Sequence, residues 1–515
     1  MVKRTWDKDR AAERIQKKID EVALKDITIK DYVRDADLFS LPKTVAYRVN
    51  GAHLYADITN LEDILATTAI EGETSHRRAL RFLNLHYRAV SRILDRVDAI
   101  LVDFHNQRLH SVFAKPYGSE SDRIHKAIAT GQLIIDVLAQ TGENADHPAA
   151  AVRIGIDSGE ALAVNNGRHA HREPLFLGEP ANHAAKRAGG GKSKGIYLTN
   201  NARVAIGLAE VENEDRAPLT TAEIETSQKA ASLGVTAETI VSEWKADLEK
   251  NPIGSFDFSG HTLPFQSLDI DTLSVKNSRR QDAISVYADI DGFTAYVADH
   301  IGSDDDAKHV VRALHVLRSE LHHVLMDDFF GIKIRYIGDC IHGLIGEGTA
   351  QTTNAVETID TATLCAGGMR SSFDLAIEKL NAAGTNAKTL GLAIGFEYGP
   401  MTITRLGMKS ELIRCSVSRG VTASEEEQKG CSGKQSAIGA TAYEKASEQV
   451  KSLFGPSRRK ADINYELAES VIKLGETASK TSAAQSLLRP ATAAAASTLS
   501  FPAKAAQPAK LAGFA

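Results

Sequence analysis

The sequence predicts an α/β protein, of the α+β kind, that contains one domain twice. A segment that reads as a strand ending in Asp occurs in each half, as Leu54–Ile58 (LYADI) and Val286–Ile290 (VYADI). Each segment is followed by a predicted hairpin, and the position 50 residues after the Asp is Gln107 in the first half and Asp339 in the second. A repeat with so long a period determines the architecture before any local assignment is made.

A third pair of segments follows in the same order. Residues 154–159 (IGIDSG) match residues 394–399 (IGFEYG). The two halves are therefore predicted to be homologous domains that face each other as a pseudo-dimer.

The spacing of apolar residues predicts the elements of the first repeat, residues 45–210. Apolar residues recur at helical spacing over 76–97 and 124–138, and partial alternation over 47–58 indicates a strand. The remaining elements are a hairpin over 99–112, a strand pair over 151–164 and a helix that opens over 180–188. Residues 281–455 form the second repeat with the same order: strand at 283, helix 307–326, hairpin 334–345, helix 361–380 and strand at 390.

Three further segments flank the repeats. Residues 1–44 are predicted as an N-terminal segment with one or two amphipathic helices, and 211–280 as a helical connector with helices over 221–233 and 236–249. Residues 456–515 form a C-terminal tail. From Lys480 this tail is rich in Ala, Ser, Thr and Pro, so it is predicted to be partly disordered.

Composition excludes several classes of function. The 515 residues are 43% hydrophobic and 25% charged, as in ordinary globular proteins, and suggest two or three domains. A net charge of −5 argues against a nucleic-acid partner. No apolar run is long enough for a membrane span or a signal peptide. The four cysteines lack CxxC spacing and indicate reduced thiols. Together these observations predict a cytoplasmic protein.

Asp289 and Asp339 are the first candidate site residues. One ends an apolar strand and the other follows Gly338 at a hairpin turn, so the fold would bring the two carboxylates together. Like charges at short distance are costly unless a cation lies between them, and oxygen ligands suit Mg²⁺ or Mn²⁺. Gly292 permits a tight turn whose amides can face a phosphate.

The segment Asp289–Thr294 (DIDGFT), followed by Gly338-Asp339, resembles the class III nucleotidyl cyclases. The resemblance covers residues 45–205 and 281–440. It implies ferredoxin-like domains that work as dimers, with active sites at their interface. It also implies two divalent cations, Mn²⁺ or Mg²⁺, bound by Asp289, Asp339 and the carbonyl of Ile290, with Gly292, Phe293 and Thr294 in the substrate-binding segment.

The same resemblance implies that the two repeats are complementary. The second repeat has Val421 and Glu425 where the family has an Asn and an Arg that stabilise the transition state. The first repeat has Gln107 at the second metal position, but residues 178–187 (GEPANHAAKR) match the family's segment with this Asn and Arg. Asn182 takes the place of the Asn and Lys186 that of the Arg, with Arg187 as the alternative. One composite site should be active and its pseudo-symmetric twin inactive.

The base-reading positions of the family fall on Asp103 and Leu175 in the first repeat, and on Arg335 and Arg414 in the second. Neither pair matches the Lys-Asp pattern for adenine or the Glu-Cys pattern for guanine. Asp103 can accept a hydrogen bond from N3–H of uracil or from the N4 amine of cytosine. The tandem architecture also resembles the pyrimidine cyclases of bacterial anti-phage (Pycsar) systems. This implies conversion of a pyrimidine nucleoside triphosphate, with UTP preferred, into a cyclic nucleotide and pyrophosphate, and a separate effector protein that binds the product.

Alternatives remain open at this stage. The chain can be an adenylate cyclase with unusual base contacts, or a catalytically silent cyclase-like protein that binds a nucleotide or has a regulatory role. The composite site can form within one chain or between the chains of a homodimer.

Overall fold

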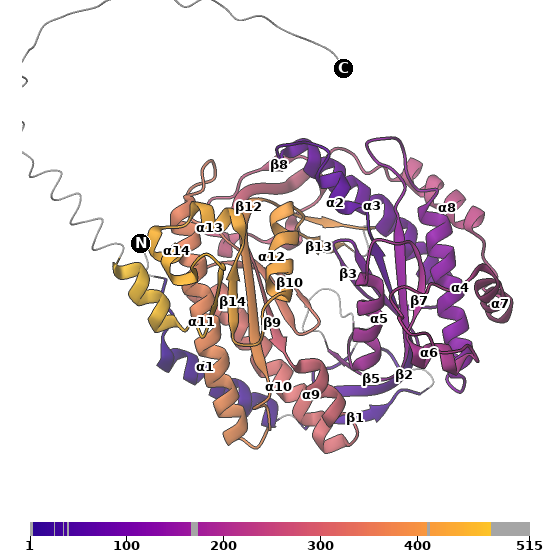
Figure 1. Cartoon of the computed structure of the whole chain (residues 1–515), viewed down its shortest axis with the longest axis horizontal. Coiled ribbons are helices and arrows are strands. Elements are labelled where there is room, and N and C mark those ends of the chain that lie inside the picture. Colours follow the sequence, from indigo (N-terminus) through magenta and orange to yellow (C-terminus); the bar gives the residue numbers. More distant parts are fainter. Residues whose placement is uncertain are drawn as a thin grey trace, which may run out of the picture.

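Each repeat contributes one mixed β-sheet to the fold. The computed structural model describes residues 4–24, 26–33, 36–38, 41–165, 174–408 and 412–474. Figure 1 shows the two sheets beside each other, with long helices on their outer sides and α5 and α12 between them. The tail predicted from Lys480 lies outside the described residues.

The first sheet has the strand order β3-β4-β2-β5-β6, with β1 beside β2 and β7 beside β5. Its strands are β1 (Thr28–Asp31), β2 (Val45–Ile58), β3 (Ile100–His105), β4 (Arg108–Phe113), β5 (Val152–Asn165), β6 (Pro174–Leu177) and β7 (Gly195–Leu198). The helices of this repeat are α2 (Leu61–Leu65), α3 (Glu73–Arg96), α4 (Glu120–Leu138), α5 (Glu179–Gly189) and α6 (Asn200–Ala205).

The second sheet has the order β10-β11-β9-β12-β14-β15, with β8 beside β9 and β13 beside β12. Its strands are β8 (Phe258–Ser259), β9 (Ser278–Asp291), β10 (Ile332–Ile337), β11 (Cys340–Ile345), β12 (Gly391–Leu406), β13 (Ile413–Cys415), β14 (Gln435–Ile438) and β15 (Arg459–Ala461). The helices are α9 (Phe293–His300), α10 (Asp304–His323), α11 (Ala355–Ala382), α12 (Arg419–Lys429), α13 (Ala440–Lys445) and α14 (Glu448–Phe454). Residues 324–328 form a short π-helical turn, and 465–474 are helical.

The predicted fold class is confirmed, because the order β3-β4-β2-β5 in the first sheet repeats as β10-β11-β9-β12 in the second. Two local predictions were wrong. The strand pair predicted over 151–164 is one continuous strand from residue 152, since β5 keeps its pairing with β2 through Gly159 opposite Gly51. Residues 28–31 form strand β1, which pairs in parallel with β2, although a second helix was predicted as possible in this segment.

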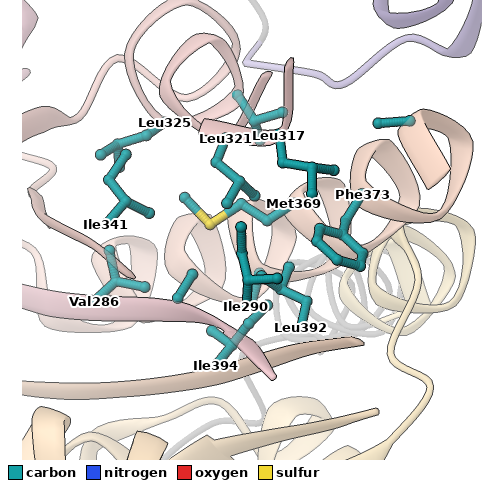
Figure 2. Packing of buried hydrophobic residues seen from close by; sticks show 14 of the residues in the cluster. Val286, Ile290, Leu317, Leu321, Leu325, Ile341, Met369, Phe373, Leu392 and Ile394 are labelled. Atoms are coloured by element: carbon teal, nitrogen blue, oxygen red, sulfur yellow. The ribbon is translucent and has the colours of Figure 1, made fainter. Parts of the chain in front are cut away.

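The core of the second repeat lies between its sheet and the helices α10 and α11. Leu317 and Leu321 of α10 and Met369 and Phe373 of α11 are at most 2% exposed and belong to one apolar cluster with Ile290 of β9. Figure 2 shows these side chains meeting above β9 and β12. This packing holds the end of β9, where Asp289 lies, against a rigid layer.

The flanking segments pack on the repeats. Helix α1 (Lys8–Leu24) lies against the second repeat, where Arg14 Nη2 is 2.6 Å from Glu320 Oε1 and Arg14 Nη1 is 2.8 Å from Asp328 Oδ1. The connector helices α7 (Thr221–Ala231) and α8 (Ala237–Lys250) lie on the first repeat, where Trp244 Nε1 donates to the Leu85 carbonyl at 3.0 Å. Within the described residues no helix is both long and apolar enough to cross a membrane, and all four cysteines are unpaired.

Each repeat also extends an edge into the core of the other. Leu175 and Leu177 of β6 belong to the apolar cluster of the second repeat. In return, Ile413 and Cys415 of β13 belong to the apolar cluster of the first. This exchange joins the repeats through buried apolar contacts within one chain.

Candidate active site

Two glycines let a helix lie directly on each sheet at equivalent positions. A Cβ at Gly155 of β5 would lie 2.1 Å from the carbonyl oxygen of Ala184 in α5. A Cβ at Gly395 of β12 would lie 2.2 Å from the backbone nitrogen of Gln428 in α12. Because only glycine permits this approach, α5 is held at the boundary between the repeats, and it presents Asn182 there.

Asp289 and Asp339 meet at a cavity of about 230 Å³ between the repeats. Asp289 lies near the end of β9, and Asp339 follows Gly338 at the β10–β11 turn, where Gly338 has a φ of +59°. The first repeat forms the opposite wall. Residues of this cavity include Tyr55, Asp103, His105, Arg108, His110, Leu175, Phe176, Asn182, Ala185, Asp289, Phe293, Thr294 and Asp339. The composite site, as we call it, therefore forms within a single chain.

The charged forms of Asp289 and Asp339 are destabilised by burial and by neighbouring carboxylates. Burial and then the neighbouring Asp291 raise the pKa of Asp289 to about 6, although a hydrogen bond with Gln428 opposes the shift. Burial and then Asp289 raise the pKa of Asp339 well above its usual value, although the backbone amide of Ile290 donates to it. Two like charges in one cavity fit a divalent cation between them, and their oxygens are ligands that Mg²⁺ and Mn²⁺ accept. The described residues contain no group of three or more His, Cys, Asp or Glu arranged to hold a metal, so further ligands would come from the carbonyl of Ile290 and from a bound phosphate.

The predicted substrate segment begins helix α9. Gly292 has a φ of +80° and precedes Phe293 and Thr294, which both line the cavity. Asn182 reaches across from α5, and its Nδ2 donates to Thr294 Oγ1 at 2.8 Å and to the Gly178 carbonyl at 3.3 Å. The Ile290 side chain is only 2% exposed in the core, which leaves its carbonyl as the candidate ligand.

The two basic candidates on α5 have different environments. Lys186 is exposed, one helical turn after Asn182, and does not line the cavity. Arg187 lies outside the cavity as well, where its Nη1 is 2.7 Å from Glu214 Oε2 and 3.4 Å from Asp215 Oδ1. Because these two carboxylates engage Arg187, we do not include it in the proposed site.

The predicted base-reading residues meet across the boundary between the repeats. Asp103 and Leu175 line the cavity, and Leu175 is 7% exposed. Arg335 lies behind this wall, and its Nη2 donates to Asp103 Oδ1. The acceptor predicted at Asp103 is therefore held by a cation from the other repeat.

Sequence reasoning missed an aromatic pair in the composite site. Tyr55 and His110 line the cavity, with ring centroids 4.2 Å apart and an interplanar angle of 13°. Tyr287 and His342 occupy the equivalent places in the second repeat and stack at 4.2 Å and 11°. Each Tyr lies two residues before the Asp of its strand, and each His lies three residues after the second metal position of its repeat. This shared spacing is a signal that could have identified the pair.

The twin site, which we define by Asp57, Arg108, Glu425 and Lys429, is filled by an ion-pair network. Arg108 Nη1 donates to Glu425, Arg108 Nε is 3.9 Å from Asp57 Oδ2, and Lys429 Nζ is 3.0 Å from Glu425 Oε1. Burial by itself would raise the pKa of Glu425, but Arg108, Lys429 and His105 outweigh burial and lower it. Glu425 thus stays ionised, and its charge would repel a triphosphate at this position.

Replacing Asp57 by Asn is expected to change the turnover number by less than about threefold. This corresponds to a change of less than about 1 kcal/mol in the activation free energy. The reason is that Gln107 already removes the second carboxylate of the twin site, and Arg108 lies beside Asp57. Steady-state kinetics with saturating divalent cation would measure this. An inactive Asp57→Asn variant with an intact fold would move the active centre to the first repeat.

Comparisons with known proteins agree with this geometry. No family model matches the chain. A uridylate cyclase of Pseudomonas aeruginosa is 55% identical over 483 residues, which cover 93% of each chain. A uridylate cyclase of a Rhizobium species is 38% identical over 442 residues, 81% of this chain and 82% of that one.

A solved structure resembles the whole described fold. It is a class III adenylyl cyclase-like ATP-binding protein of Pseudomonas aeruginosa, with a TM-score of 0.89 and 55% identity, and the match covers 92% of this chain and 100% of that one. Identity at this level across both repeats shows that the chain belongs to the uridylate cyclase family of class III nucleotidyl cyclases.

Proposed function

We propose that this chain is a uridylate cyclase that converts UTP into 3′,5′-cyclic UMP and pyrophosphate. The observation that carries the proposal is the composite site itself. One repeat contributes both carboxylates, Asp289 and Asp339, and the other contributes Asn182 to the same cavity. The names of the two relatives support uracil as the base.

We propose that Asp289, Asp339 and the carbonyl of Ile290 hold two divalent cations, Mg²⁺ or Mn²⁺, together with the triphosphate. When bound, such ions lower the pKa of the ribose 3′-hydroxyl and neutralise charge on the phosphates. The raised pKa values of both carboxyls support this assignment, because a cation would offset the repulsion that raises them.

The side chains of the first repeat act on the reacting phosphate. The 3′-oxygen forms a bond to the α-phosphorus while the bond to the pyrophosphate oxygen breaks. Negative charge then grows on the α-phosphate oxygens. The Asn182 amide can donate a hydrogen bond to them when one of its two N–H groups leaves its present acceptor, and the longer bond, to the Gly178 carbonyl, is the one we expect to be exchanged. Lys186 would add positive charge after its flexible side chain turns from solvent towards the phosphates. Thr294 Oγ1 accepts a hydrogen bond from Asn182 Nδ2 at 2.8 Å and holds the amide towards the site before substrate binds.

The base is assigned to the end of the cavity formed by Asp103, Leu175, Tyr55 and His110. The apolar side chain of Leu175 supplies no donor or acceptor for a purine edge. Asp103, oriented by Arg335, can accept from N3–H of uracil. The same carboxylate can accept from the N4 amine of cytosine, so it favours a pyrimidine without choosing between the two.

We expect the pyrimidine nucleotides to be cyclised at least about tenfold faster than ATP or GTP, since a purine would leave Asp103 unpaired at a cost of about 1–3 kcal/mol. The names of the relatives lead us to expect cyclic UMP as the main product. Purified protein would receive all four nucleotides at equal concentration with Mn²⁺, and mass spectrometry would identify the products. If cyclic CMP is the main product, the family assignment stands and the base is cytosine in place of uracil. Dominant cyclic AMP would establish the alternative adenylate cyclase, which the ATP-binding solved relative makes worth testing.

A silent cyclase-like protein would give no cyclic product with any of the four nucleotides. From the resemblance to the Pycsar cyclases, we also propose that the cyclic product is a signal in anti-phage defence, bound by a separate effector. Loss of phage protection in cells that carry the Asp339→Asn variant would test this role.

A further inference from the structure

A second cavity lies where helix α1 meets α10, β10 and the residues before β9. Its volume is about 420 Å³, compared with about 230 Å³ for the composite site, and the two cavities share no lining residue. Cavities of this size are typical of small-molecule sites. Neither the cyclase reaction nor the packing of the two repeats accounts for it.

The charge of this cavity differs from that of the whole protein. Among the residues that the structure describes, Lys18, Lys43, Arg318, Lys333 and Arg414 line it together with two acidic residues, Glu21 and Asp269. Arg414 is paired with Asp271, with 2.6 Å between Nη2 and Oδ2, so the other four cations exceed the two acidic residues by two, although the chain as a whole carries a net charge of −5. Clustered cations of this kind raise the local concentration of an anion.

Two of these cations share one aromatic ring. Arg318 Cζ is 3.7 Å and Lys333 Nζ is 4.1 Å from the centroid of the Tyr336 ring. The Tyr336 hydroxyl donates to the Arg318 carbonyl at 2.9 Å, which fixes the ring beside the helix. The Tyr336 ring therefore holds both cations at the cavity, where a bound anion could interact with each of them.

Two histidines in the same wall have unused hydrogen-bonding capacity. His315 Nε2 and His322 Nδ1 are buried and have no hydrogen-bond partner among the described residues. Burial, followed by neighbouring cations, lowers the pKa of His315 to about 3 and that of His322 to about 4. Both rings are therefore neutral near pH 7. A buried ring nitrogen without a partner is costly, and a ligand oxygen could satisfy it.

Apolar side chains form another part of the wall, with Val22, Ile27, Leu268, Ile270 and Ile332. A purely inorganic anion would leave this part uncovered. We propose that this cavity is a second, non-catalytic binding site for an organic phosphate. The phosphate would contact Arg318, Lys333 and the two histidines, and the organic part would lie against the apolar wall.

The test uses full-length protein stripped of divalent cations over a chelating resin. Without cations, Asp289 and Asp339 repel phosphates from the composite site, so anion binding elsewhere can be measured. Isothermal titration calorimetry would use uridine 5′-monophosphate and inorganic phosphate as probes. We expect one saturable site for the nucleotide, with inorganic phosphate at least about tenfold weaker because it lacks apolar contacts.

Two variants alter the cavity by different means. Lys43→Glu/Lys333→Glu reverses two charges and should weaken nucleotide binding at least about tenfold, since hydrogen bonds to charged groups are strong. Ser319→Phe fills the cavity without changing its charge and should also weaken binding. Lys229→Glu/Lys245→Glu on α7 and α8 is the matched control, because it also reverses two charges, at exposed residues outside the cavity, and should leave the affinity unchanged. Thermal melting would confirm that each variant is folded.

Three results would overturn the proposal. The first is the absence of saturable binding in the wild-type protein. The second is equal affinity of wild type and the folded double variant. The third is binding that Asn182→Ala removes and Lys43→Glu/Lys333→Glu retains, because it would place the ligand in the composite site. None of these results depends on which nucleotide the enzyme cyclises.

Discussion

Replacing Asp289 or Asp339 by Asn is expected to lower turnover by about 10³-fold or more. Divalent cations stabilise the transition state for phosphoryl transfer by several kcal/mol, and each 1.36 kcal/mol corresponds to a factor of ten in rate. Asn keeps the size of the side chain and removes the charge that would hold the cation. The measurement is the rate of cyclic nucleotide formation with saturating Mn²⁺.

Stability measurements separate this effect from misfolding. Without divalent cation, both variants should melt at or above the wild-type temperature, because each removes one of two buried like charges. Added Mn²⁺ should raise the melting temperature of the wild type and leave that of the variants unchanged.

Asp291→Asn is a suitable control for the charge change, since Asp291 does not line the cavity and its Oδ2 accepts from the Gly433 amide at 2.7 Å. An Asn side chain keeps an acceptor for that bond, so this variant should retain activity. Near-normal turnover of Asp289→Asn or Asp339→Asn would show that the carboxylate pair does not bind the catalytic cations.

Replacing Asn182 by Ala is expected to lower kcat by about 10²-fold with little change in KM. The lost amide is proposed to act on charge that develops only in the transition state, and removal of one such donor typically costs this much. Steady-state kinetics with UTP would provide both constants.

Thr294→Val tests whether the role of Asn182 is only structural, as a contact between α5 and α9. This variant removes the 2.8 Å hydrogen bond between Asn182 and Thr294 and keeps the amide in the cavity. We expect it to lose less than about tenfold in kcat, the effect of one ordinary hydrogen bond. Equal losses in both variants would make Asn182 a structural link between the repeats.

The basic residues of α5 offer a further comparison for the same prediction. Lys186→Ala should lower kcat, because no other cation of α5 is available to the phosphates. Arg187→Ala should lower stability instead, since it removes the ion pairs of Arg187 with Glu214 and Asp215. If Arg187→Ala lowers kcat and Lys186→Ala lowers only stability, then Arg187 would be the residue that acts on the phosphates.

Several features of the site followed from pattern alone. The 50-residue spacing placed Asp289 and Asp339 on a strand end and a hairpin, and the structure has both at one cavity. The segment around Asn182 was predicted to face these carboxylates, and Asn182 lines the same cavity. These predictions succeeded because strand and helix periodicity, and the order of elements in a repeat, are local properties of the chain.

Other features could not be read from the sequence. Arg335 donates to Asp103 although the two are 232 positions apart, and Arg108 donates to Glu425 across 317 positions. Such partners are chosen when one repeat docks on the other, and no local pattern records that docking. The stacked pair of Tyr55 and His110 similarly depends on the register between β2 and β4, which places these two residues opposite each other.

The sequence by itself therefore determined that this protein is a duplicated cyclase with one complementary set of carboxylate and amide residues. Only the tertiary structure decided that the composite site closes within one chain, that Arg187 belongs to an ion pair outside it, and that salt bridges fill the twin site. The physical reason is that periodicity encodes which face of an element is buried. The charge partners of a buried side chain are determined by which distant elements pack against that face.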